Sequence, residues 1–165
     1  MISSIDECRD YVVEIQITKE VVSIRDRNFS INSCNPTSEG RFHRVGEPTF
    51  YFASGESTAK AERYGDANAD IDEKDVLCNM PLGNHLLFDS RAFFRDHPEE
   101  AEYYCGSRDS GSWRNCQDLR CILSINNVSG ILYDSAQLAG GVNLAVWPLT
   151  SDGLPVSYIR LAGYE

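Results

Sequence analysis

The stretch Gly40-Arg41-Phe42-His43-Arg44-Val45-Gly46-Glu47-Pro48-Thr49-Phe50-Tyr51-Phe52-Ala53 contains a polar turn and then a compact apolar segment. Aromatic and β-branched residues favour a strand, so we expect one over 49–54. Side chains alternate between the two faces of a strand, and Tyr51 therefore points away from its neighbouring phenylalanines. If the phenylalanines face the core, Tyr51 faces a cleft. In the reversed register Tyr51 is a core residue with a satisfied hydroxyl.

A helix is predicted directly after this strand. The chain should turn at Gly55, and residues 56–64 are rich in alanine, lysine and glutamate, with Ser57 and Thr58 available as N-caps. Glu62 then lies on the first or second helical turn. The stretch thus holds an arginine, a tyrosine and a glutamate at fixed distances across a turn, a strand and a helix.

The rest of the chain alternates short apolar runs with polar loops. Residues 11–17 fit a strand or a helix-to-strand entry, residues 28–39 and 105–115 should be loops, and 66–75 is an acidic, exposed excursion. Many short strands with few, separated helices indicate a single α+β domain over 1–165, mainly antiparallel sheet with flanking helices. The predicted strands are 21–24, 49–54, 76–80, 85–89, 130–133 and 142–148, and the predicted helices are 56–64, 91–104 with a break at Pro98, and 116–125.

The composition of the chain limits the classes of partner that it is expected to bind. The chain has 165 residues and a net charge of -10, which disfavours binding to phosphate backbones or anionic lipid unless a local basic patch exists, and we find none in the sequence. No apolar run is long enough for a membrane span, and residues 1–10 do not resemble a signal peptide. We therefore expect a cytoplasmic protein that contacts neither nucleic acid nor membrane directly.

Six cysteines are present, an even number that suits a disulfide framework in a secreted chain. No Cys-x-x-Cys pair occurs and the histidines are far from the cysteines in sequence, so a zinc site is weakly supported and we expect no metal. Reduced thiols are the favoured interpretation. The cysteines are Cys8, Cys34, Cys78, Cys105, Cys116 and Cys121.

Glu62 is the candidate catalytic carboxylate. Breaking a glycosidic bond produces an oxocarbenium-like centre, which a nearby carboxylate stabilises. Taken alone, Glu62 is more simply an exposed helix glutamate. Its neighbours in the pattern strengthen the catalytic hypothesis, because Arg25, Arg27 and Arg41 flank the same loop and arginine binds pyrophosphate through two parallel hydrogen bonds. The alternative for each arginine is a surface ion pair.

A second candidate region follows the predicted strand 130–133. Ser135 stands just past the strand end, where a hydroxyl meets a phosphate or ribose oxygen, and Asn143 braces the loop through its amide. An ordinary turn serine fits equally well. An anion clamp, a stacking ring and a carboxylate together are what a site for NAD requires, as a substrate rather than a cofactor.

With these residues in place, the chain resembles the RES-domain family. The matching stretches are Ile24-Arg25-Asp26-Arg27, Gly40-Arg41-Phe42 with Gly46, Tyr51-Phe52-Ala53, Thr58-Ala59-Lys60-Ala61-Glu62 and Gly130 to Ser135 through Gly141-Val142-Asn143, spread over about residues 21–148. The resemblance implies a fold similar to ADP-ribosyltransferases, and a toxin that consumes NAD and is held inactive by a cognate antitoxin. It implies that Arg25, Arg41, Tyr51, Glu62 and Ser135 are the motif residues.

The expected function is cleavage of the nicotinamide–ribose bond by a glycohydrolase or phosphorylase. Glu62, Arg41 and Tyr51 are the expected catalytic residues, and Arg25, Arg27, Arg41, Tyr51, Ser135 and Asn143 the expected NAD-binding residues. Two alternatives stay open: transfer of ADP-ribose to a protein, and a module that binds a nucleotide or partner without turnover. His43 departs from the asparagine that is frequent in the family, which leaves the shape of the pocket open.

Overall fold

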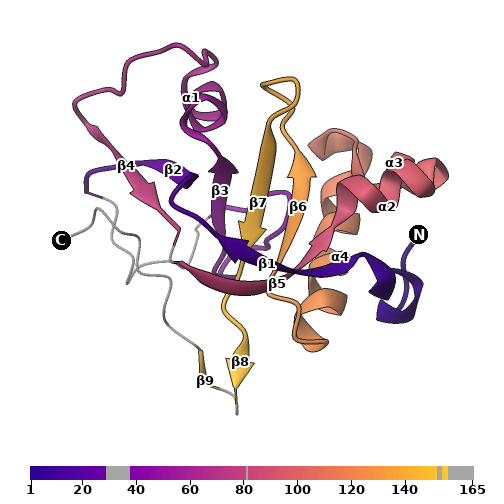
Figure 1. Ribbon diagram of the computed structural model, residues 1–165. Coiled ribbons are helices and arrows are strands. Elements are labelled where there is room, and N and C mark those ends of the chain that lie inside the picture. The colour runs from indigo at the N-terminus through magenta and orange to yellow at the C-terminus, as the bar shows by residue number, and fades with distance from the viewer. Residues whose placement is uncertain (29–37, 81, 152–153, 156–165) are drawn as a thin grey trace.

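The computed structural model describes residues 1–28, 38–80, 82–151 and 154–155 (Figure 1). Its centre is a seven-stranded sheet in the order β1-β5-β6-β7-β3-β2-β4, in which only the β5–β6 pair is parallel. A separate two-stranded ribbon, β8-β9, follows the sheet. The strands are β1 Val12–Ile17, β2 Val21–Asp26, β3 Phe50–Ser54, β4 Asp75–Asn79, β5 Gly83–Asp89, β6 Gly130–Asp134, β7 Val142–Val146, β8 Thr150–Ser151 and β9 Leu154–Pro155.

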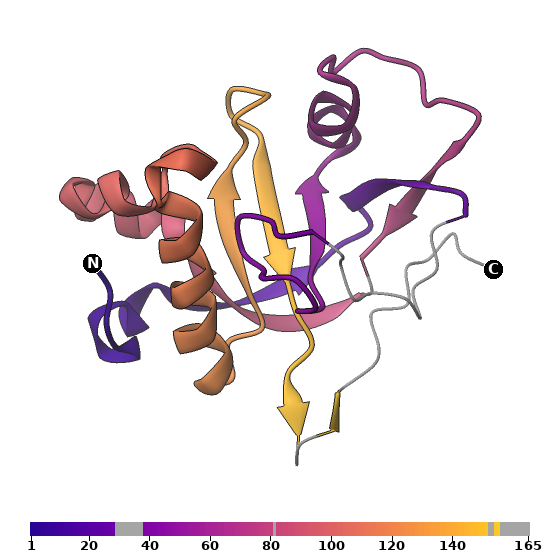
Figure 2. The same cartoon turned by 180° about the vertical axis from the view of Figure 1, so that it is seen from behind.

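The helices form two groups around this sheet (Figures 1 and 2). Three of them, α2 (Ser90–Asp96), α3 (Pro98–Tyr104) and α4 (Ser112–Ile125), pack together on one side. The fourth, α1 (Glu56–Tyr64), lies over β2 and β3. Short 3₁₀ helices precede β1 and α4, at Ile5–Glu7, Arg9–Tyr11 and Arg108–Ser110. The α+β class with a mainly antiparallel sheet and flanking helices is confirmed.

Both faces of the central strands are buried, and successive residues alternate between two cores. Phe88, Ile131 and Ala145 face the core beneath α2–α4. Their neighbours Leu87, Leu132 and Leu144 face a second core, with Phe50, Phe52, Cys78 and Met80. Burial on both faces explains why these strands are continuous apolar runs rather than alternating ones.

Most predicted elements agree with the structure to within a few residues. The helix over 56–64 and the break before Pro98 are confirmed, and residues 12–17 are a strand. Two details were wrong. The last long helix begins at Ser112, not Cys116, so the predicted loop is shorter. The N-cap of α1 is Gly55, whose φ of 114° suits glycine, and neither Ser57 nor Thr58 caps the helix.

Other predictions fall partly outside the described residues. The loop over 28–39 and the last segment, 151–165, are described only in part. Within the described ranges, Cys8, Cys78, Cys105, Cys116 and Cys121 are free thiols. No helix in the same ranges is long and apolar enough to cross a membrane.

The acidic segment that begins at Asp66 is tied to the end of α1. Asp75 is 5% exposed and accepts hydrogen bonds from the Arg63 guanidinium at 2.8 Å and the Tyr64 hydroxyl at 2.7 Å. The Arg63 guanidinium, and to a lesser degree the Tyr64 hydroxyl, lower the pKa of the Asp75 carboxyl. The segment is thereby anchored at its C-terminal end, where β4 begins.

Arg120 of α4 fixes the 40–48 loop against the helix. Its buried guanidinium donates to the Phe42 carbonyl at 3.3 Å and the Pro48 carbonyl at 2.8 Å, and lies 5.2 Å from the centre of the Trp147 ring. The loop packs beside α4 (Figure 2). Because the loop also carries Arg41, the Arg120 side chain connects a segment of the candidate site to the core.

Replacing Arg120 with methionine should lower the free energy of unfolding by about 2 kcal/mol, because one buried and one half-buried carbonyl lose their donor. Urea denaturation measures the change. Arg44→Met is the matched control, since Arg44 forms an exposed ion pair with Asp118 and such pairs contribute about 0–1 kcal/mol. Equal losses in the two variants would contradict the role assigned to Arg120.

Candidate functional site

The candidate site forms at one end of the strands β6, β7 and β3, which are neighbours in the middle of the sheet. These three strands are neighbours and antiparallel, so the end of β6, the start of β7 and the end of β3 lie side by side. Asn143 pairs in register with Tyr133 on one side and Ala53 on the other. Because α1 directly follows β3, Glu62 lies near the same ends of these strands.

Glu62 is held by two side chains from the opposite hairpin. Its Oε1 accepts a hydrogen bond from the Ser135 hydroxyl at 2.5 Å and another from the Asn143 amide at 2.7 Å. The Ser135 oxygen in turn accepts the backbone N–H groups of Gln137 and Leu138, each at 3.1 Å. Among the described residues no donor engages Oε2. Glu62 is an exposed helix residue, yet its carboxylate is fixed in position with one oxygen available to a ligand.

Two cavities meet at this carboxylate. The smaller, of about 270 Å³, is lined by Arg25, Tyr51 and part of β2 and β3. The larger, of about 790 Å³, is lined by the 41–42 loop, α2, the start of α4 and the hairpin after β6. Glu62, Tyr133 and Asn143 line both. A ligand that spans the two cavities would therefore pass Glu62 at its middle.

The hydroxyl of Tyr51 belongs to a closed hydrogen-bond network. His43 Nε2 lies 3.0 Å from the Ser38 carbonyl, which only accepts, so Nε2 carries the proton and Nδ1 accepts from the Tyr51 hydroxyl at 2.8 Å. The Phe42 N–H donates to the same hydroxyl at 3.1 Å. A Cβ on Gly40 would lie 2.3 Å from the His43 ring, so glycine is required there. Burial raises the pKa of Tyr51 to about 12, and the phenol stays neutral.

This arrangement combines the two alternatives that the sequence left open for Tyr51. Phe50 and Phe52 are buried on one face of β3, as expected, and Tyr51 lies on the opposite face and lines the smaller cavity. Its hydroxyl is nevertheless satisfied within the protein. The ring, rather than the hydroxyl, is what a ligand would contact.

The three predicted arginines are not brought together. Arg25 lines the smaller cavity and donates to the Tyr51 carbonyl at 3.0 Å. Arg41 lines the larger one, and the carbonyls of Tyr104 and Gly106 hold its guanidinium at 2.7 and 3.2 Å. Arg27 lies outside both cavities, where it donates to the Glu73 carbonyl at 2.7 Å. A single clamp made of all three does not exist in this structure.

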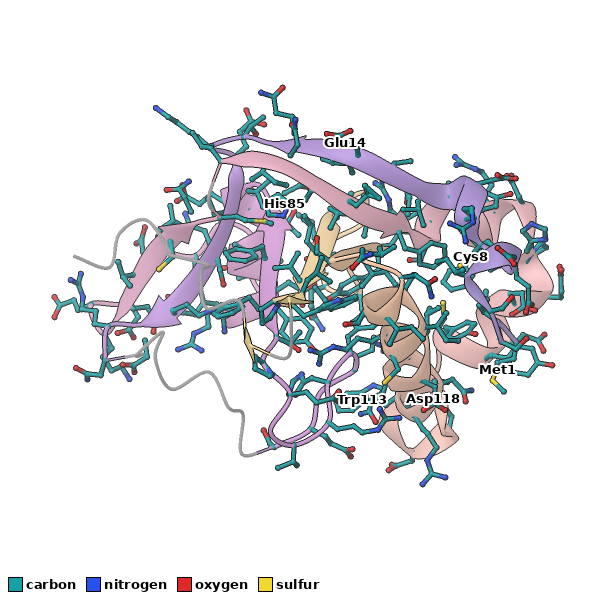
Figure 3. The ribbon with its side chains drawn as sticks, turned by 90° about the horizontal axis from the view of Figure 1, so that it is seen from below. Met1, Cys8, Glu14, His85, Trp113 and Asp118 are labelled. Carbon is teal, nitrogen blue, oxygen red and sulfur yellow. The ribbon has the colours of Figure 1, made fainter. Side chains whose placement is uncertain are left out.

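Sequence reasoning missed several residues that line the larger cavity. Arg91, Phe94 and Arg95 come from α2. Trp113, which is labelled in Figure 3, lies at the start of α4. Tyr133, which lines both cavities, lies within a sequence motif but had no predicted role of its own. The i, i+4 spacing of Arg91 and Arg95 on a predicted helix was a signal for a shared cationic face.

His43, which is buried, and His85, which is half-buried, should make the fold sensitive to acid. Burial lowers the pKa of His43 and of His85, so both stay neutral in the folded protein. The unfolded chain protonates them near pH 6.5 and then binds more protons than the folded chain, so stability falls as pH drops below about 6.5. Urea denaturation from about pH 8 to 5 measures this slope. His43→Gln should flatten it, and an unchanged slope would exclude His43 as a source.

The features above define a class: a single α+β domain that presents a helix-borne carboxylate, fixed by a serine and an asparagine, where two arginine-bearing cavities join. The chain belongs to the RES-domain family, whose model matches residues 22–160. The matched region contains every motif residue named from the sequence.

One solved structure extends the comparison of the fold. A chain in the crystal structure of the M. tuberculosis MbcT–MbcA toxin–antitoxin complex is similar, with a TM-score of 0.60 and 18% identity, over 86% of this chain and 80% of that chain. At this identity the similarity concerns the fold alone. No curated protein matches the chain.

Proposed function

We propose that the protein cleaves the nicotinamide–ribose bond of NAD, as a glycohydrolase or phosphorylase, and acts as a toxin that depletes the cellular pool. The observation that carries the proposal is the Glu62 carboxylate, held by Ser135 and Asn143 at the junction of two cavities. Membership of the RES-domain family supports it.

The proposed chemistry uses the positive charge already present on NAD. When the bond between the ribose C1 and the pyridinium nitrogen breaks, its electron pair returns to the ring and nicotinamide leaves as a neutral molecule without needing a proton. Positive charge then develops on the ribose. Glu62 Oε2 is the group available to stabilise that charge and to orient the water or phosphate that attacks C1.

The two cavities suggest how NAD would lie. Two tyrosines, Tyr51 and Tyr133, line the smaller cavity, and aromatic residues of this kind suit a flat pyridine ring. The larger has room for the adenosine diphosphate half, since ligand pockets are typically about 300–1,000 Å³. In this orientation the bond to be broken passes Glu62.

Incubation of the purified protein with NAD tests the proposal, with nicotinamide and the sugar product resolved by chromatography. Free ADP-ribose would identify water as the acceptor, and a phosphorylated product formed only with added phosphate would identify phosphate. Transfer of labelled ADP-ribose to a protein would support the transferase alternative. If no nicotinamide is released with or without phosphate, the enzymatic proposal is contradicted. The alternative of a module that binds a nucleotide or partner without turnover would then be favoured.

We also propose a protein partner that blocks the cavities. The similarity of the fold to a chain from a toxin–antitoxin complex supports it. Expression in a bacterial host should arrest growth, and coexpression of the cognate antitoxin should restore it. Unimpaired growth of cells that contain the active enzyme would contradict the toxin role.

A further inference from the structure

One face of α2 borders the larger cavity. Ser90, Arg91, Phe94 and Arg95 line it, and their spacing of one, three and one residues is that of a single helical face. Phe93, on the other side of the helix, is 3% exposed and packs in the core beneath the sheet. The core contact of Phe93 thereby fixes which face of α2 meets the cavity.

This face carries two arginines in different electrostatic settings. Arg91 is locked by Asp89, which accepts from its Nε at 2.9 Å and its Nη2 at 3.0 Å and also caps the helix. Arg95 is exposed, and among the described residues no carboxylate lies within ion-pair distance of it. Arg95 therefore brings an uncompensated positive charge to the cavity wall.

Arg41 lines the same cavity and is held by the carbonyls of Tyr104 and Gly106 at the end of α3. Glu62 and Asp134 are the carboxylates that line the same cavity. The wall formed by α2 and Arg41 is thus locally cationic in a protein whose net charge is -10. A local excess of positive charge of this kind allows a polyanion to bind in a protein that is acidic overall.

Flat aromatic surfaces lie beside these cations. The rings of Phe94 and Tyr104 are stacked, with centroids 5.6 Å apart and an angle of 25° between their planes. Trp113 lines the cavity from the start of α4. Guanidinium groups beside aromatic rings match a ligand that has both phosphates and a purine base.

We propose that the α2 face, whose Arg91 and Arg95 line one cavity together with Arg41, is the subsite for a nucleoside diphosphate, namely the ADP half of the dinucleotide. The assignment rests on the proposed function for the identity of the whole ligand. Arg95 and Arg91 are binding residues that contact the phosphates, and Arg25, in the other cavity, does not share this subsite.

Binding of ADP tests the subsite without requiring catalysis. ADP titrated into the full chain should change the fluorescence of Trp113, since this side chain lines the cavity, whereas Trp147 is 2% exposed. Arg95→Gln should weaken ADP binding by about 10- to 100-fold, as expected for loss of a charge-assisted hydrogen bond. Arg9→Gln is the control for net charge, because Arg9 pairs with Asp6 at the exposed N-terminal segment.

Kinetic measurements of nicotinamide release distinguish a failure of this inference from a failure of the proposed function. Arg95→Gln should raise KM for NAD by a similar factor but leave KM for nicotinamide mononucleotide, which lacks the adenylate half, unchanged. If ADP binds through Arg95 and no nicotinamide is released, the subsite stands and the proposed function fails. If nicotinamide is released and Arg95→Gln binds ADP and NAD as the unsubstituted protein does, the subsite is overturned and the function stands.

Discussion

Replacing Glu62 with glutamine should reduce the rate of nicotinamide release by about 10²- to 10³-fold, the loss typical of removing one group that stabilises transition-state charge. Glutamine has nearly the same shape, and its amide oxygen can still accept the hydrogen bonds of Ser135 and Asn143. The negative charge that faces the developing ribosyl cation is lost. Steady-state kinetics measure the effect, and thermal unfolding should show little change.

Glu56→Gln is the matched control for this substitution. Glu56 lies on the same helix and pairs with Lys60 at 3.1 Å, away from both cavities. Its replacement should leave the rate unchanged. The catalytic assignment would be abandoned if Glu62→Gln kept the full rate, or if both substitutions reduced it equally. Growth arrest on expression should likewise require Glu62 and not Glu56.

Asn143→Asp should produce the second large effect. Asn143 is 5% exposed and its amide lies 2.7 Å from Glu62 Oε1, so aspartate replaces a donor with a second carboxylate at the same place. Two carboxylates this close do not both ionise readily, and the pKa of one is raised. We expect the rate at neutral pH to fall by about 10²-fold, because the pair retains a proton and Glu62 loses its fixed position.

The stability of this variant should depend on pH in a defined direction. A carboxyl with a raised pKa binds its proton more tightly in the folded state than in the unfolded state. The variant should therefore be least impaired in acid and lose stability as pH rises through the raised pKa. Asn126→Asp, at the exposed end of α4, removes a similar amide donor without a neighbouring carboxylate. A pH profile of Asn143→Asp that matches this control would refute the argument.

The elements that form the site were largely predictable because their signals are local. Alanine, lysine and glutamate after an aromatic strand specified α1, and the bounds 56–64 agree with the structure. The placement of Tyr51 opposite Phe50 and Phe52 followed from the period of a strand. The cap was not predictable in this way, because the polar candidates Ser57 and Thr58 lie two and three residues past the capping position at Gly55.

The predicted grouping of the arginines failed because their positions depend on residues that are distant in sequence. Arg25 and Arg27 would share a strand face if the strand continued, but β2 ends at Asp26 and Arg27 turns toward Glu73. The separation of Arg25 and Arg41 into two cavities follows from the hairpin that brings Tyr133 and Asn143 between them. No local pattern encodes that arrangement.

The spacing of the hydrogen bonds to Glu62 has a consequence during synthesis. The carboxylate receives its partners from residues 73 and 81 positions further along the chain. A ribosome that has made α1 has not yet made the hairpin that orients it, and β3 still lacks β7 as a neighbour. The candidate site is therefore incomplete in the nascent chain until β7 has been made, so the proposed activity would begin only after most of the described sheet has been synthesised.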